Sequence, residues 1–133
     1  MTPVFLHAAP RPSRKPPSPS EAQIQRSIIA YLALAAPNVF AYAIPGAARR
    51  IAGGRAGNAV AGLTRGIPDI GLVLPDGRAA FIEVKAEAGR LSPVQSDMLR
   101  SLAARSIPFA VCRSSLDVAA ALRDWGVLVK ERI

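Results

Sequence analysis

The chain has 133 residues, half of them hydrophobic, and its 17 Lys and Arg against 9 Asp and Glu give a formal net charge of +8. This length fits one globular domain. The longest apolar run, Ile28 to Ala36, ends at Pro37 and falls short of the roughly 18 residues of a spanning helix, which excludes a transmembrane protein. The single Cys112 excludes an intramolecular disulfide framework and a cysteine-based zinc site. We therefore expect a cytoplasmic protein.

Residues 1–19 are expected to form a disordered leader. They hold six of the twelve prolines and show neither a helical nor a strand period. The folded domain should accordingly comprise residues 20–133.

The first predicted helix covers residues 21–35. Ser20 and Gln23 have the spacing of a capping box, and apolar residues then recur at helical spacing until Pro37 ends the pattern. The apolar and aromatic run from Val39 to Ile44 predicts a short strand.

The next segment, residues 46–66, is rich in glycine and arginine. It holds six of the ten glycines and four arginines, and the longer stretch from Ala22 to Pro68 has five arginines and no acidic residue. Because clustered arginines bind phosphates with release of counterions, nucleic acid is favoured as a partner over a merely solvated surface. The candidate DNA-contacting residues are Arg49, Arg50, Arg55, Arg65 and Arg90.

Two strand-like runs, residues 69–74 and 78–85, flank Pro75-Asp76-Gly77 and predict a hairpin. With a three-residue loop, paired residue numbers sum to 152, so Asp69 faces Glu83, and Lys85 shares that face because strand side chains alternate. A four-residue loop would shift the sum to 153 and turn Asp69 to the other face. The turn residues favour the shorter loop, since glycine accepts a left-handed third position.

The remaining elements follow from a second capping box. Ser92-Pro93-Val94-Gln95 begins a helix that should continue to about Arg105. Further along we expect a strand at 108–112, a helix capped by Ser114 or Ser115 that ends near Trp125, and a last edge strand at 127–129. This order predicts an α/β fold, a mixed sheet flanked by helices.

The facing acids of the hairpin suggest chemistry. Two carboxylates across a ladder repel each other unless a cation lies between them. Carboxylate oxygens are hard ligands that suit Mg²⁺ or Mn²⁺, and the backbone carbonyl of Val84 could be a further ligand. Lys85 beside such a metal could orient an attacking water or neutralise charge on phosphorus. Asp69, Glu83 and Lys85 therefore form the parts of metal-dependent phosphodiester hydrolysis.

Three blocks in this order resemble the VRR-NUC domain of the PD-(D/E)XK nuclease superfamily: Gly66-Ile67-Pro68-Asp69, Phe81-Ile82-Glu83-Val84-Lys85 and Gly89-Arg90-Leu91-Ser92-Pro93-Val94-Gln95. The resemblance implies a restriction-endonuclease-like α-β-β-β-α-β core and a DNA endonuclease. It also implies that Asp69 and Glu83 are metal ligands and that Lys85 is the catalytic lysine. Glu21 would be a first-helix acid at the same metal, and Gln95 a polar contact of the catalytic site.

Small members of this family further imply a phage or bacterial homodimer that cuts branched DNA such as four-way junctions. Alternatives stay open. Glu21 in a first helical turn is also explained by the helix dipole, and Gln95 by its capping box. A sequence-specific or flap nuclease, a non-catalytic nucleic-acid-binding module and a basic structural protein are the rival functions.

Overall fold

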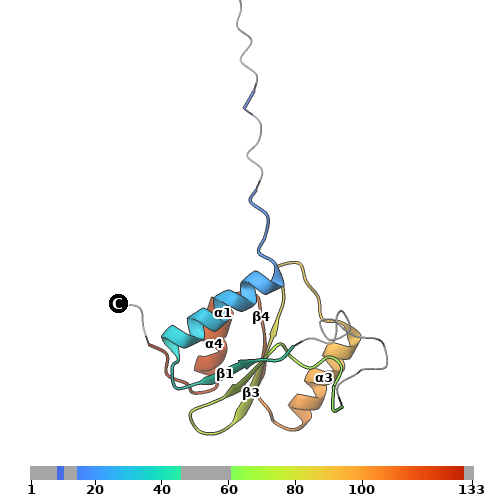
Figure 1. The fold of residues 1–133 in the computed structure, drawn as a ribbon, viewed down its shortest axis with the longest axis vertical. Coiled ribbons are helices and arrows are strands. Elements are labelled where there is room, and N and C mark those ends of the chain that lie inside the picture. The colour runs from blue at the N-terminus through green and yellow to red at the C-terminus, as the bar shows by residue number, and fades with distance from the viewer. Residues whose placement is uncertain (1–8, 11–14, 46–60, 131–133) are drawn as a thin grey trace, which may run out of the picture.

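The computed structural model describes residues 9–10, 15–45 and 61–130 (Figure 1). Helix α1 and three strands come first: α1 (Glu21–Ala35), β1 (Phe40–Ala43), β2 (Ile70–Val73) and β3 (Ala79–Val84). They are followed by α3 (Pro93–Ala104), β4 (Phe109–Cys112) and α4 (Ser115–Asp124). This is the predicted α-β-β-β-α-β order, and helix α1 has the predicted bounds.

The four strands form one mixed sheet in the order β1-β2-β3-β4. Neighbours are antiparallel from β1 to β3, whereas β3 and β4 are parallel. Parallel neighbours need a crossover connection, and α3 supplies it. The predicted α/β class is confirmed, and β3 is an internal strand with a partner on both sides.

The hairpin register has the predicted sum of 152, since Ile70 pairs with Ile82 and Val73 with Ala79. The amide of Leu74 donates to the Arg78 carbonyl at 2.8 Å, which closes the three-residue loop. Gly77 has φ +89°, the left-handed conformation that the third loop position requires. The register therefore directs Asp69, one residue before β2, toward Glu83.

Both predicted capping boxes form. In α1, Ser20 accepts from the amide of Gln23 while the Gln23 side chain accepts from the amide of Ser20. Ser92 and Gln95 do the same at the start of α3. These caps fix where each helix begins, and hence where the first-turn side chains lie relative to the sheet.

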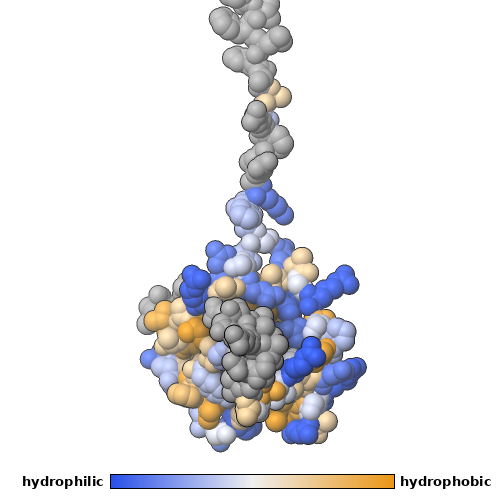
Figure 2. Space-filling view, turned by 45° about the vertical axis from the view of Figure 1, so that its right-hand side comes forward, coloured by the Kyte–Doolittle hydropathy of each residue, from blue (hydrophilic) through white to orange (hydrophobic). Residues whose placement is uncertain are grey.

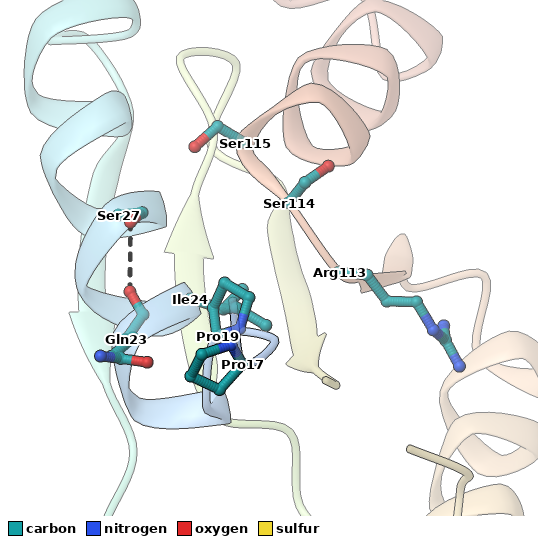
Figure 3. Close-up of a pocket in the computed structure, with 8 residues that line it drawn as sticks. All are labelled: Pro17, Pro19, Gln23, Ile24, Ser27, Arg113, Ser114 and Ser115. Atoms are coloured by element: carbon teal, nitrogen blue, oxygen red, sulfur yellow. Dashed lines mark hydrogen bonds between the residues drawn. The ribbon is translucent and has the colours of Figure 1, made fainter. Parts of the chain in front are cut away.

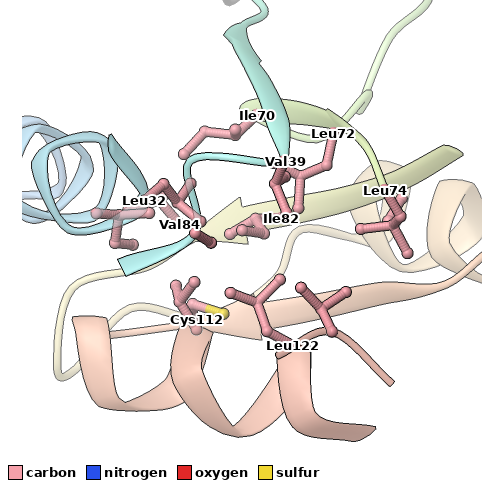
Figure 4. Close-up of a cluster of buried hydrophobic side chains, with 14 of the residues drawn as sticks. Leu32, Val39, Ile70, Leu72, Leu74, Ile82, Val84, Cys112 and Leu122 are labelled. Carbon is pink, nitrogen blue, oxygen red and sulfur yellow. The ribbon is translucent and has the colours of Figure 1, made fainter. Parts of the chain in front are cut away.

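One face of the sheet is packed by α1 and α4. Because side chains alternate along a strand, Ile70, Ile82 and Val84 point to this face. They meet apolar residues of both helices in a single buried cluster (Figure 4), which includes Ile28, Leu32, Leu72, Cys112, Val118 and Leu122. Burial raises the pKa of the Cys112 thiol to about 12, so it packs there as an apolar group. Helix α3 lies on the opposite side of the sheet (Figure 1).

The predicted last strand at 127–129 is wrong. The amide of Val127 donates to the Leu122 carbonyl at 2.8 Å, and the amide of Lys130 donates to the Ala35 carbonyl at 2.7 Å. These residues therefore satisfy the carbonyls at two helix ends instead of adding to the sheet. Among the helices of the described residues, none is both long and apolar enough to cross a membrane.

Candidate active site

The predicted acids meet at the open end of the β2–β3 hairpin, opposite its turn. Asp69 Oδ2 accepts a hydrogen bond from the amide of Val84 at 2.8 Å. The carboxylate thus replaces the backbone carbonyl that a further residue of β2 would offer to this amide in the ladder with β3. A residue of an extended strand directs its N–H and C=O to the same neighbour, so the Val84 carbonyl also leaves β3 on the side of Asp69.

The loop before β2 is fixed by α3. Gly66 has φ +75°, and a Cβ there would lie 2.7 Å from the Val94 carbonyl oxygen, so only glycine allows this approach. Pro68 is buried next to Asp69. The first and third blocks of the resemblance, which are separated in the sequence, are therefore neighbours in the fold.

Glu83 is the most enclosed acid of the site, with a side chain 3% exposed. Its Oε1 accepts a hydrogen bond from Gln95 Nε2 at 3.0 Å. Burial, followed by the negative charge of Asp69 and a hydrogen bond with it, raises the pKa of Glu83 to about 8. Without a metal, the fold therefore favours the protonated form of Glu83. A cation between the two acids would favour its ionised form.

Lys85 lies between two carboxylates. Its Nζ is 3.8 Å from Glu83 Oε1 and 3.9 Å from Glu21 Oε1, and its side chain is 9% exposed. Glu21, in contrast, is half exposed. The first turn of α1 thus reaches the end of β3, and the predicted set of Glu21, Asp69, Glu83, Lys85 and Gln95 is brought together.

Arg113 is a residue of this region that the sequence did not reveal. Its Nη2 donates to the Gly89 carbonyl at 2.7 Å. A Cβ on Gly89 would lie 3.5 Å from Glu21 Oε1, so the arginine holds a loop that borders the site. Arg113 follows Cys112, which pairs in parallel with Val84. Arg113 and Lys85 therefore lie at the same end of the neighbouring strands β4 and β3. Only the parallel pairing of β3 with β4, which has no local sequence signal, could have indicated that Arg113 lies near the site.

The donor atoms of the site fit a hard divalent cation. They are the oxygens of two facing carboxylates, Asp69 and Glu83, with the Val84 carbonyl beside them. Within the described ranges, no group of three or more His, Cys, Asp or Glu side chains could hold a metal ion. Mg²⁺ does not require such a cage, because it keeps several waters and is commonly held by one or two carboxylates together with substrate phosphates.

A separate cavity of about 550 Å³ lies between the start of α1 and the start of α4 (Figure 3). Pro17 and Pro19 border it, and Arg113, Ser114 and Ser115 line its α4 side. Its lining contains no acidic side chain, so it offers no hard ligand for a metal. The acids of the candidate site lie outside this cavity, at the open end of the β2–β3 hairpin.

The arginines are only partly described. Arg65 and Arg90 are both exposed, one in the turn before β2 and the other in the loop after β3. Arg49, Arg50 and Arg55 lie outside the described residues. Figure 2 shows hydrophilic side chains around the base of the leader and along the sides of the folded body, with apolar side chains between them.

Comparison with known proteins names the family of this fold, which is a family of nuclease-type domains. The model of the VRR-NUC domain family matches residues 37–116, more than half of the chain, so the chain belongs to this family. The match runs from β1 to the start of α4 and includes every residue of the predicted site except Glu21.

A solved structure described as a VRR_NUC domain has the same fold. It superimposes with a TM-score of 0.55 at 20% sequence identity, over 79% of this chain and 96% of that chain. No curated protein matches.

Proposed function

We propose that this domain is a Mg²⁺- or Mn²⁺-dependent endonuclease that hydrolyses phosphodiester bonds of DNA. The observation that carries the proposal is the juxtaposition of the buried Glu83 carboxylate and the part-buried Asp69 carboxylate with an almost buried lysine, Lys85, at the end of β3. Asp69 and Glu83 would hold the metal, with the Val84 carbonyl as a further ligand and Glu21 as an acid at its periphery.

Each side chain has a defined task in this proposal. The metal would supply Lewis acidity toward a phosphate oxygen and toward water. The Lys85 ammonium, which can only donate, would stabilise negative charge that develops on the phosphate. Gln95 orients Glu83 by donating to its Oε1. Glu21 restrains the Lys85 head from the side of α1, through a contact of 3.9 Å.

Branched DNA is the substrate that we propose, with four-way junctions as the leading case. The net charge of +8 supports a polyanionic ligand, and Arg49, Arg50, Arg55, Arg65 and Arg90 would contact its phosphates. A four-way junction has two-fold symmetry, and a C2 homodimer would present two matching sites to it. The proposal includes a cytoplasmic location, where the lone Cys112 stays reduced.

A cleavage assay tests the function directly. The full chain is incubated with linear, flapped and four-way DNA in Mg²⁺, in Mn²⁺ and in EDTA. We expect metal-dependent cuts, with paired nicks in the four-way junction. Undiminished cleavage in EDTA would contradict the metal site. Tight binding without cleavage in any metal would instead indicate a nucleic-acid-binding module, and cuts at one sequence in linear DNA a sequence-specific nuclease.

We also propose that residues 20–133 suffice for folding and cleavage. In the described part of the leader, Ser18 Oγ donates a hydrogen bond to Glu87 Oε2 at 3.0 Å, and this bond is exposed. Exposed bonds of this kind contribute little to stability. A chain that begins at Pro19 should therefore unfold cooperatively and cut like the full chain.

A further inference from the structure

The sheet face that carries the acids also carries an exposed aromatic pair, Phe40 and Tyr42 of edge strand β1. Their ring centroids lie 5.9 Å apart. Phe40 is 65% exposed and Tyr42 39%, and Val73, which pairs with Phe40, is 40% exposed. Side-chain alternation places all three on the face opposite the core packed by α1 and α4. The aromatic pair is therefore apolar surface that the described fold does not cover.

The Tyr42 ring lies across strand β2. A Cβ on Gly71, its pairing partner, would be 2.2 Å from Tyr42 Cζ and 2.4 Å from its hydroxyl oxygen. Any side chain at position 71 would therefore displace the ring. A glycine inside a strand often marks such a close approach. Here it allows the phenol ring to be held against the sheet while part of the ring remains accessible.

The aromatic pair is continuous with the candidate active site. Asp69 lies two residues from Gly71 on the same face, a separation of about 7 Å along the strand. The pairing of β1 with β2 extends this far, because the amide of Ile44 donates to the Asp69 carbonyl at 2.7 Å. A DNA strand with its scissile phosphate at Asp69 and Glu83 thus has an adjoining nucleotide within reach of Tyr42.

We propose that Tyr42, supported by Phe40, binds an unpaired nucleobase next to the scissile phosphate by stacking. This inference rests on the proposed nuclease function and deepens it. A base inside a duplex has both faces occupied by its neighbours, whereas an unstacked base at a branch can lie on an aromatic ring. Stacking is tolerant of sequence because every base has a π-face. The pair would therefore favour branched DNA without reading its sequence.

A second copy of the chain is a poorer occupant of this surface. A stable protein interface buries about 800 Å² on each partner. A wholly buried aromatic side chain contributes about 150–250 Å². Two partly exposed aromatic residues and one valine fall well short of that area, whereas one base covers about the area of one ring.

Binding without cleavage tests the inference. The full chain with Lys85→Ala is titrated in Mg²⁺ with flapped DNA that carries 2-aminopurine in turn at each unpaired position next to the branch, and with the matched duplex. We expect the probe to be quenched at one position. Adding Tyr42→Leu should abolish the quenching and raise the Kd for flapped DNA about tenfold, with less than about a twofold change for the duplex.

Three further variants make the result interpretable. Tyr42→Trp retains a ring and should keep the quenching, and Phe40→Leu should weaken it. Leu34→Ala removes a side chain that is 76% exposed on α1, on the other side of the sheet, and should change neither quantity. Thermal unfolding of each variant establishes that it is folded. If Tyr42→Leu fails to fold, the inference is tested by Phe40→Leu against Leu34→Ala: only Phe40→Leu should weaken the quenching.

Equal weakening on flapped and duplex DNA, or no weakening, overturns the inference. The inference is also overturned if Tyr42→Leu lowers the mass from light scattering but leaves the DNA affinity unchanged. That result would assign this face to contact with a second copy of the chain. Failure of the nuclease function is recognised separately, because the unmodified chain would then cut none of the substrates in Mg²⁺ or Mn²⁺.

Discussion

At the turn of the β2–β3 hairpin, Asp76 accepts hydrogen bonds from the amide and the guanidinium of Arg78, at 3.1 Å and 2.6 Å. Both side chains are about half exposed, and the hydrogen bonds from Arg78 lower the pKa of Asp76. At the open end of the same hairpin, Asp69 and Glu83 face each other in a largely enclosed site. There the pKa of Glu83 is raised to about 8.

The two ends of the hairpin differ in how their ionised carboxylates affect the stability of the fold. At the turn, each charge has a nearby partner and water, so the ionised carboxylate is the favoured form. At the open end, the Lys85 ammonium lowers the pKa of Glu83 less than burial and Asp69 raise it. The metal-free fold therefore carries a cost there that an apolar pair would avoid. Strongly perturbed carboxylate pairs of this kind cluster at functional sites, and a bound cation would remove the cost.

The largest difference between the two ends should appear in cleavage. Asp69→Asn, Glu83→Gln and Lys85→Ala should each lower kcat on branched DNA on the order of a thousandfold, because each removes a charge needed at the reacting phosphate. Asp69→Asn is the sharpest of the three, since an amide oxygen can still accept from the Val84 amide and preserve the hairpin end. Single-turnover cleavage in Mg²⁺ measures the effect.

The matched controls come from the turn. Asp76→Asn and Arg78→Met also remove charge from the hairpin, yet they should leave cleavage within about twofold, since exposed substitutions away from the site perturb little. Wild-type rates in all three open-end variants would refute the assignment of the site. Equal losses at both ends would show that the effect arises from the hairpin's stability and not from its chemistry.

A smaller effect is expected in stability, without metal. Unfolded Glu83 loses its proton near its ordinary value of 4.5, whereas the folded side chain keeps it to about 8. The folded state binds more protons within this window, so the contribution of Glu83 to stability falls as pH rises from about 4.5 to about 8. Glu83→Gln cannot titrate. In EDTA its free energy of unfolding, from urea titrations, should increasingly exceed that of wild type as pH rises through this range.

Mg²⁺ supplies the complementary measurement. Metal ligands must be deprotonated, so added Mg²⁺ should raise the Tm of wild type more above the pKa of Glu83 than below it. Glu83→Gln should respond weakly at every pH. A difference between variant and wild type that stays constant with pH would contradict the enclosed, proton-holding state of Glu83.

Local chemistry made most of the fold predictable. Capping boxes at Ser20 and Ser92 set the starts of two helices, and Pro75-Asp76-Gly77 set a loop length that determines the whole hairpin register. The prediction of a strand at 127–129 was wrong because a short apolar run also suits a segment that packs under helix ends. The amide of Val127 bonds to a carbonyl of α4, and the amide of Lys130, the residue after this segment, bonds to a carbonyl of α1. No local pattern distinguishes that arrangement from a strand.

The juxtaposition of the candidate residues Asp69, Glu83 and Lys85 was predictable because it depends on that register. The ion pair of Glu21 with Lys85 needs the docking of α1, and the contact of Arg113 with Gly89 needs the parallel pairing of β3 with β4. Both are long-range contacts without a local signal. The family resemblance had suggested Glu21 and Gln95, and their positions beside Lys85 and Glu83 are compatible with both a catalytic and a structural role.

The smallest effect is expected from Asp76→Asn on stability, and its pH dependence should be opposite to that of Glu83→Gln. The folded-state pKa of Asp76 is lowered from 3.8. Its contribution is therefore present above about pH 4 and is lost as pH falls through the folded value. The variant keeps an oxygen that can accept from the Arg78 amide but loses the charge. In urea titrations it should be slightly less stable than wild type near neutral pH and indistinguishable from it in acid, with unchanged cleavage. A deficit that grows toward low pH, or one that follows the trend of Glu83→Gln, would show that the turn does not favour the ionised carboxylate.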